Sequence, residues 1–250
     1  MSLDLNTVLR EWGHEQGKIK VRKIAGLDGR EKLQLRVDLG VLQMEMIGRP
    51  DGVRPHGCES LLEYHQQKAA RAAHRGENYD LSIEHCAELQ QEGIQYYHRY
   101  LSLFQINDFP GVVRDTQRNL DLFDFVAEHT DREELSWNLQ QFRPYVLMMN
   151  TRAKASILLG QGKFPDAMKE IQHGRDAIAE FFERSNFPEL AAKSSEIAFL
   201  DEWLNEVRTK RPLSKVEVME REMESAIAKE LYERAAELRD AIRLLKMQPH

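Results

Sequence analysis

Cysteine is scarce in this chain of 250 residues, which contains only Cys58 and Cys86. Two cysteines cannot build the multiple crosslinks of a small secreted domain, so the sequence predicts a reducing, intracellular environment. Long hydrophobic runs are also missing, and the first nine residues contain neither a basic segment nor an apolar core of signal-peptide length. We therefore expect a cytoplasmic protein without a membrane-spanning helix.

The motifs of common enzyme sites are absent as well. There is no phosphate-binding G-x-x-x-x-G-K-[ST], no dinucleotide-binding G-x-G-x-x-G and no G-x-S-x-G turn around a nucleophilic serine. Potential metal ligands gather near two predicted helix starts, but they lack the spacings C-x-x-C, H-E-x-x-H or paired E-x-x-H. These residues are His56, Cys58, Glu63, His65, Glu84, His85, Cys86 and Glu88. We therefore expect no catalytic residue, no metal and no cofactor, and a metal-dependent enzyme is the least favoured alternative.

A one-sided basic run is lacking too. Residues 58–207 carry 15 basic and 25 acidic residues, whereas residues 1–57 and 208–250 each carry 10 basic and 8 acidic residues. The net charge of the whole chain is −6. An acidic middle repels phosphate groups, and neither end offers the basic patch that nucleic-acid binding needs. The sequence therefore predicts no direct contact with DNA or RNA.

The chain does have enough apolar material for a core, with 42% hydrophobic and 30% charged residues. Helical spacing dominates its middle, where apolar residues recur at steps of three and four. Tyr97 belongs to one such stripe and is expected to face the core, and Pro144 either kinks or divides another. The predicted helical segments are 61–72, 86–104, 112–127, 135–157, 171–182 and 190–207.

A short pattern recurs between these helices. An aromatic residue followed by proline occurs in Asp108-Phe109-Pro110, again 55 residues later in Lys163-Phe164-Pro165, and in Asn186-Phe187-Pro188. The ring can fill the corner between two antiparallel helices, while proline takes a first-turn position that needs no N–H. Leu231-Tyr232 has the same arrangement without proline. The stretch 153–182 resembles a tetratricopeptide repeat, which implies a body of antiparallel helix pairs.

The N-terminal part has the period of β-strands. Apolar residues alternate from Leu33 to Val41 and again at Ile19 and Val21, with the turn-forming Asp28-Gly29 between the two runs. This predicts a β-hairpin, which must pack on the helices or on the strand edge of another subunit. The segment 47–57, rich in glycine and proline, is either a plain connection or a small loop that binds an anion or a peptide.

The last forty residues hold the most specific pattern. The apolar residues of Met223–Leu245, MESAIAKELYERAAELRDAIRLL, predict two amphipathic helices joined by a tight turn. Ser214 and Glu217 form an S-x-x-E capping box at the start of the first helix. Ala235-Ala236 lets the helices approach closely, and Tyr232 at the turn is expected to cover the open end of the pair.

This segment resembles the UVR motif, which is named for the B and C subunits of the bacterial excision-repair nuclease and is similar to segments of Clp-type unfoldases and McsA-type kinase activators. Tyr232 stands where phenylalanine is usual, and Leu231 where a polar residue is expected; neither change breaks the pattern. The match lies in Met223, Ala226, Tyr232, Glu233, Ala235, Ala236, Leu238, Arg239, Asp240 and Ile242. The resemblance implies a protein-docking element rather than a catalytic one.

The docking surface that the resemblance implies would face a repair subunit, a Clp-type unfoldase or a second copy of the chain. Such a short hairpin buries too little apolar surface to be stable alone, so its stripes are covered either by a partner or by the chain's own body. A polar linker at 208–212 favours a partner. The partner-binding residues implied are Met223, Ala226, Tyr232, Glu233, Ala235, Ala236, Arg239 and Asp240.

The sequence therefore predicts a mainly α protein in three parts. These are an N-terminal β-hairpin and Gly/Pro-rich loop at 1–57, a tetratricopeptide-like helical body at 58–207, and a UVR-like helical hairpin at 208–250. The expected function is that of a non-catalytic, bacterial-type intracellular adaptor or scaffold, with one protein partner on the helical body and another on the hairpin. The alternative is an accessory factor of nucleotide excision repair that acts through a repair subunit.

Overall fold

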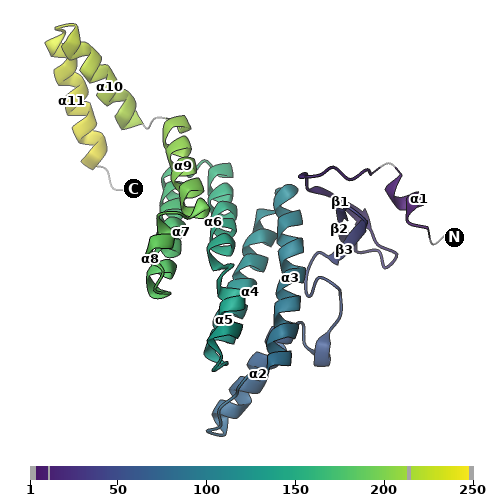
Figure 1. The fold of residues 1–250 in the computed structure, drawn as a ribbon. Coiled ribbons are helices and arrows are strands. Elements are labelled where there is room, and N and C mark those ends of the chain that lie inside the picture. The colour runs from purple at the N-terminus through teal and green to yellow at the C-terminus, as the bar shows by residue number, and fades with distance from the viewer. Residues whose placement is uncertain (1–3, 11, 213–214, 248–250) are drawn as a thin grey trace. The chain divides into compact units, whose positions relative to one another are not determined.

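The computed structural model describes residues 4–10, 12–212 and 215–247. The chain forms two compact units, residues 1–204 and 205–250 (Figure 1). Helices predominate, a small sheet lies near the N-terminus, and a two-helix hairpin ends the chain, so the predicted fold class is confirmed. The helices are α1 (Asn6–Leu9), α2 (Leu61–His74), α3 (Ile83–Gln105), α4 (Phe109–Glu128), α5 (Glu133–Gln140), α6 (Arg143–Gly160), α7 (Phe164–Arg184), α8 (Pro188–Ala191), α9 (Ser195–Lys210), α10 (Lys215–Ala228) and α11 (Tyr232–Met247), with a 3-10 turn η1 at Pro55–Gly57.

The N-terminal sheet is antiparallel and has the strand order β1 (Lys20–Ala25), β2 (Glu31–Val37), β3 (Gly40–Glu45). Its middle strand contacts α3, and Leu33, Leu35 and Met44 are buried. The sheet therefore packs on the helices, which satisfies the need of so small a sheet for an apolar support.

The alternating run from Leu33 to Val41, which we expected to be one strand of a two-stranded hairpin, belongs to two strands, β2 and β3. The sheet therefore has three strands instead of two. The run divides at the turn Asp38-Leu39, where the Leu39 side chain is 89% exposed. After this turn Leu33 pairs with Met44, so the core-facing positions change from odd to even numbers. Val41 consequently lies on the opposite face, and a continuous period of two could not predict that change.

The centre of the first unit consists of α3, α4, α6 and α7 in two antiparallel pairs. Each of these helices packs against the next one in this series (Figure 1). Small residues allow the close approach: a Cβ atom on Gly174 of α7 would lie 1.9 Å from Thr151 Oγ1 of α6. The helical-repeat body predicted from the apolar stripes is therefore present.

Two of the three predicted Phe-Pro corners share one backbone geometry, whereas at the third Phe187 is itself the N-cap residue, with φ −126° and ψ 50°. The N-cap residues Asp108 and Lys163 have nearly the same φ and ψ, −81° and 68° against −84° and 62°, and the half-buried Phe109 and Phe164 follow them. A residue with positive φ stands before each corner, and asparagine and glycine tolerate this conformation best. These residues are Asn107 (60°), Gly162 (73°), Asn186 (61°) and Glu230 (59°).

Two of the predicted helical segments are interrupted. Segment 135–157 divides into α5 and α6, with Pro144 in the first turn of α6, which was one of the two alternatives. The continuous helix expected over 190–207 is wrong, because α9 begins only at Ser195. The hydroxyl of Ser194 accepts a hydrogen bond from the Ile197 N–H at 3.3 Å, and serine favours such a capping position over a helix interior.

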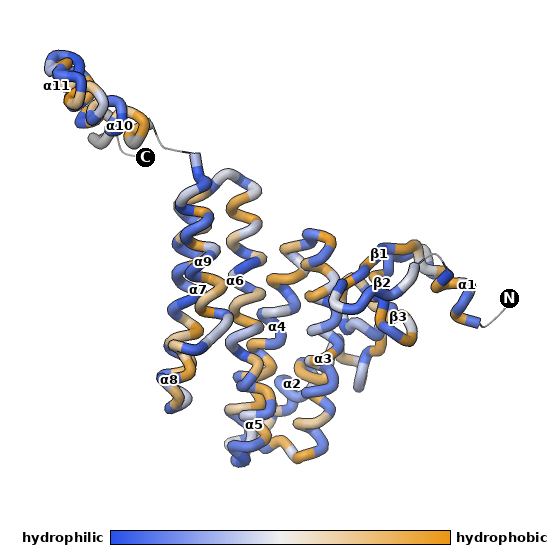
Figure 2. Tube along the Cα trace, turned by 45° about the horizontal axis from the view of Figure 1, so that its top comes forward, coloured by the Kyte–Doolittle hydropathy of each residue, from blue (hydrophilic) through white to orange (hydrophobic). Residues whose placement is uncertain are grey.

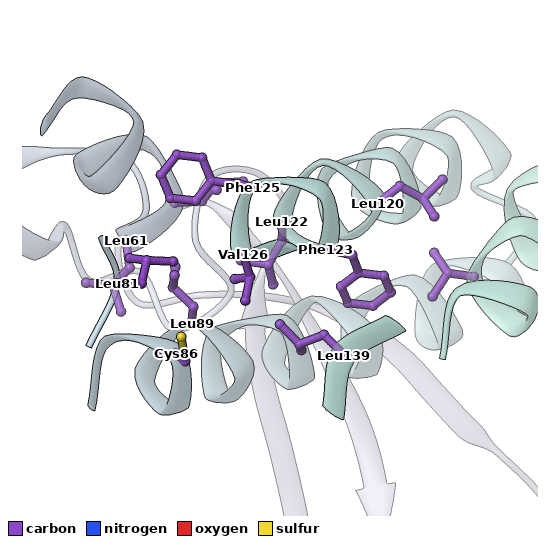
Figure 3. Close-up of a cluster of buried hydrophobic side chains, with 12 residues drawn as sticks. Leu61, Leu81, Cys86, Leu89, Leu120, Leu122, Phe123, Phe125, Val126 and Leu139 are labelled. Atoms are coloured by element: carbon purple, nitrogen blue, oxygen red, sulfur yellow. The ribbon is translucent and has the colours of Figure 1, made fainter. Parts of the chain in front are cut away.

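The main apolar core lies where α2, α3 and α4 meet α5 and the start of α6 (Figure 3). Leu89 and Val126 are completely enclosed there. Burial raises the pKa of the Cys86 thiol, so this cysteine is a core residue rather than a reactive one. The cluster comprises Leu61, Leu62, Leu81, Cys86, Leu89, Leu120, Leu122, Phe123, Phe125, Val126, Leu139 and Val146.

Buried charged side chains hold the end of the sheet on the helices. Both guanidinium nitrogens Nε and Nη2 of Arg99 donate to the Asp115 carboxylate, at 2.6 and 2.8 Å. Its Nη1 donates to the backbone oxygens of Glu45 and Gly48, at 3.1 and 2.7 Å. The glycine-rich segment after β3 is thus hydrogen-bonded to α3.

In the parts of the chain that the structure describes, no helix is both long and apolar enough to cross a membrane. Hydrophilic and hydrophobic residues follow one another along the long helices (Figure 2). This mixture is the pattern of helices that bury one face and expose the other.

Candidate functional site

The C-terminal hairpin is the first candidate site. Its helices α10 and α11 pack closely, and the buried side chains between them are Ala226, Ala235, Leu238 and Ile242. At the turn, the Leu231 N–H donates to the Ala226 oxygen at 2.8 Å. Alanines at the seam allow the close approach that the sequence predicted, but they leave the hairpin with a small core.

Tyr232 lies on the surface and does not cover the open end of the pair. Its side chain is 67% exposed at the first position of α11. It comes three residues before Ala235 and six before Leu238, the buried residues of the seam. Ile227 and Leu231 beside the turn are also exposed, at 49% and 54%. We call these three exposed apolar residues beside the turn the turn cluster.

The other residues that the resemblance implied lie in different places. Met223 and Ala236 are half-buried, and Glu233 is exposed next to Tyr232. Arg239 and Asp240 are exposed on α11 and pair with each other, with Arg239 Nη2 at 2.9 Å from Asp240 Oδ1. The eight residues therefore divide between the seam, the turn and an outer face.

Part of the predicted first turn of α10 lies outside the described residues. Ser214 of the expected capping box belongs to this part, and the side chains of Glu217 and Leu245 are not described. The capping box remains a prediction.

A model of the UvrB/uvrC motif, UVR, matches residues 214–248, which cover this hairpin. The C-terminal hairpin is a UVR motif. No curated protein and no solved structure matches the chain. The UVR motif is a protein-interaction module, which agrees with the exposed turn cluster.

A second candidate is a cavity of about 440 Å³ in the first unit, between α3, α4 and the α5–α6 region. Its lining contains no aspartate, glutamate, lysine or arginine. Burial lowers the pKa of His98 and raises that of Tyr145, so both line the cavity as neutral groups at pH 7. The cavity was missed by sequence reasoning, because Tyr97 fitted an apolar stripe and was assigned to the core, whereas 37% of it is exposed.

Three of the candidate metal ligands, His56, His65 and His85, belong to an aromatic cluster around α2 instead. His65 is buried, its Nδ1 lies 2.6 Å from the Tyr79 hydroxyl, and its ring centroid lies 4.8 Å from that of His85. His56 stacks on Tyr64 with centroids 4.0 Å apart. Within residues 4–10, 12–212 and 215–247, no three His, Cys, Asp or Glu side chains are grouped so that they could hold a metal ion.

Proposed function

We propose that the protein is an intracellular, non-catalytic adaptor that binds one protein partner through the UVR hairpin and another through the helical body. The observation that carries this proposal is the turn cluster, three exposed apolar residues on an interaction module. An exposed aromatic with two aliphatic neighbours is the kind of anchor on which protein interfaces depend. The apolar cavity of the helical body supports a second binding surface.

The alternative is an accessory role in nucleotide excision repair, and the name of the UvrB/uvrC motif is what favours it. In that role the hairpin would bind a repair subunit. The charge distribution opposes direct DNA binding, because residues 58–207 have a net charge of −10 and the flanking parts have mixed charge.

Affinity capture with the full chain tests the adaptor proposal. We expect Tyr232→Ala to reduce recovery of the hairpin partner at least tenfold, as for other aromatic anchors. Leu244→Ala is the matched control, because Leu244 is 66% exposed on the same helix but lies away from the turn. The captured protein is then purified and its binary binding is measured, with a repair subunit, an unfoldase and a second copy as the specific candidates. Equal binding by both variants would contradict the proposal.

Retention on duplex DNA tests for direct DNA contact. The adaptor proposal expects no retention at physiological salt. Retention that falls steeply as salt increases would instead show direct phosphate contacts and favour the repair role.

A further inference from the structure

Beyond the cavity, an aromatic strip continues along α3 and α6. Tyr97 of α3 and Tyr145 of α6 meet at the cavity, with ring centroids 6.3 Å apart. Seven residues later on each helix, Phe104 and Arg152 meet, with the guanidinium carbon 4.4 Å from the ring centroid. Because a helix rises 1.5 Å per residue, these two contacts are about 10 Å apart along the helices.

Arg152 pairs with aromatic rings rather than with a carboxylate in the described part of the chain. Its guanidinium group lies between the rings of Phe104 and Phe199, at 4.4 and 4.7 Å from their centroids. Among the described residues, no carboxylate lies within ion-pair distance of it, and its one hydrogen bond is a weak contact to Met149 Sδ at 3.6 Å. Burial lowers the pKa of Arg152, which indicates a poorly solvated cation. Such a charge gains strongly from a carboxylate.

Glu196 is the carboxylate whose charge acts on this face, through Tyr145. It forms no ion pair with Arg152 in the described part of the chain, and it accepts hydrogen bonds from the hydroxyls of Ser194 and Ser195 at 2.8 and 3.2 Å. The cavity lining also supplies no carboxylate, although residues 58–207 carry ten more acidic than basic residues. This face therefore suits an acidic ligand better than the rest of the unit does.

The cavity itself offers apolar walls and unused polar groups. The hydroxyls of Tyr97, Tyr100 and Tyr145 form no hydrogen bond within the described part of the chain. The rim is open, since Ile94 is 40% and Phe142 is 52% exposed. A large apolar side chain can enter, while the tyrosine hydroxyls can donate to backbone carbonyl groups of the segment that carries it.

We propose that this face binds a segment of a partner protein that places a large apolar side chain in the cavity and a carboxylate, about 10 Å away, on Arg152. The inference rests on the proposed adaptor function and specifies the partner of the helical body. A small ligand would be largely enclosed in one pocket, whereas here the binding features extend over two helical turns beyond the cavity. A segment in the polyproline II conformation advances about 3.1 Å per residue with three residues per turn, so an apolar and an acidic residue three positions apart would face the same side at about this spacing.

A random dodecapeptide library displayed on phage, selected on the full-length protein, tests the proposal. We expect enriched peptides to carry a large apolar residue with Asp or Glu three positions away. The best peptide is then synthesised, and its dissociation constant is measured by fluorescence anisotropy. Arg152→Gln should raise this constant about tenfold or more, as for the loss of a charge-assisted pair. Replacing the peptide's acidic residue by its amide should have little further effect in that variant.

Matched variants control for changes elsewhere. Arg184→Gln removes an exposed arginine of α7 and should leave peptide binding unchanged. Ile94→Glu places a carboxylate on the rim and should abolish binding, whereas Ile83→Glu, on the same helix and 47% exposed, should not. Both isoleucines are exposed, so neither variant threatens folding, and circular dichroism confirms it.

Three outcomes would overturn the inference. The first is a selection in which acidic residues are not enriched. The second is a peptide that binds the Arg152→Gln variant as tightly as the wild type. The third is a selection that yields no binding peptide, while 3-phenylpropionate shifts the tyrosine resonances of the cavity in NMR spectra. The last result would indicate a small-ligand pocket. Tyr232→Ala should not alter peptide binding, so the hairpin's role is judged separately. If this variant loses the hairpin partner but still binds the peptide, both the adaptor proposal and this inference stand. If the hairpin partner binds but no peptide does, only this inference is refuted.

Discussion

Arg99 is 1% exposed, and its guanidinium group joins two helices to the segment that follows the sheet. Its partners lie 16 residues away at Asp115 and 54 residues away at the Glu45 carbonyl. Pairing over such separations cannot be inferred from spacing, because nothing in the local sequence distinguishes Arg99 from a solvated charge on a helix. The residue scale is therefore where sequence reasoning was weakest.

Removing the charge of Asp115 should destabilise the first unit strongly. Asp115→Asn leaves the buried Arg99 cation without its counter-charge, and breaking a buried pair in this way costs about 3–5 kcal/mol. Chemical denaturation measures the change. Asp121→Asn on the exposed side of the same helix is the control, and an equally small effect for both would show that Arg99 is solvated.

His65 should make stability depend on pH. Burial, with smaller contributions from the charges of His85 and Lys68, lowers the pKa of His65 from 6.5 to about 4 in the folded protein. Between these values the unfolded chain binds a proton that the folded chain does not, so stability is complete above pH 6.5 and falls as the pH approaches 4. The loss is at most about 3 kcal/mol.

Denaturation at several pH values between 7.5 and 4.5 measures this loss. In His65→Gln the fall should be smaller, whereas His74→Gln, exposed on the same helix, should behave as the wild type. Parallel curves for all three proteins would mean that His65 titrates normally.

At the scale of elements, the corners were predictable because the residues that make them are local. Asn107 and Gly162 adopt positive φ, Phe109 and Phe164 follow, and proline stands in the first helical turn. Each of these preferences acts within four residues, so the sequence shows it directly. The third strand was not predictable in this way, since the turn at Asp38-Leu39 changes which positions face the core.

The two aromatic corners should contribute similarly to stability. Phe109→Ala and Phe164→Ala each remove a half-buried ring, so we expect a cost of about 2 kcal/mol, below the ~3–5 kcal/mol of a fully buried one. Melting curves of the single variants test this. A large difference between them would show that the corners, although equal in backbone geometry, are packed differently.

The sheet provides a matched pair of substitutions on one strand. Leu33 is completely buried, whereas Val37 is only half-buried near the end of β2. Leu33→Asp should unfold the sheet, because it buries an unpaired charge, and Val37→Asp should have a much smaller effect. Thermal melting ranks the two, and the reverse order would show that the core contacts the Val37 end of this face of β2 more closely than the Leu33 position.

For the whole molecule, the two candidate surfaces differ in how they could be found. The hairpin is one continuous segment, so residues from Met223 to Ile242 identify it and the family model confirms it. The cavity is formed by residues from Gln90 to Val146 on helices that meet only in the folded chain. Because its lining residues come from several helices, no single segment of the sequence predicts such a cavity.

Whether the hairpin serves a partner or covers its own body is decided by the melting of the full chain. If the turn cluster binds a partner, Tyr232→Ala should change stability by less than about 0.5 kcal/mol, as for other surface substitutions, because the Tyr232 ring is 67% exposed. Leu238→Ala provides the comparison, since Leu238 is 4% exposed in the hairpin seam and its loss should melt the hairpin. Both variants would then lose the partner, but only Leu238→Ala would lose helicity. A fall in the melting temperature of the whole chain on Tyr232→Ala, with binding reduced only in proportion to unfolding, would contradict partner docking and show that the turn cluster packs on the chain itself.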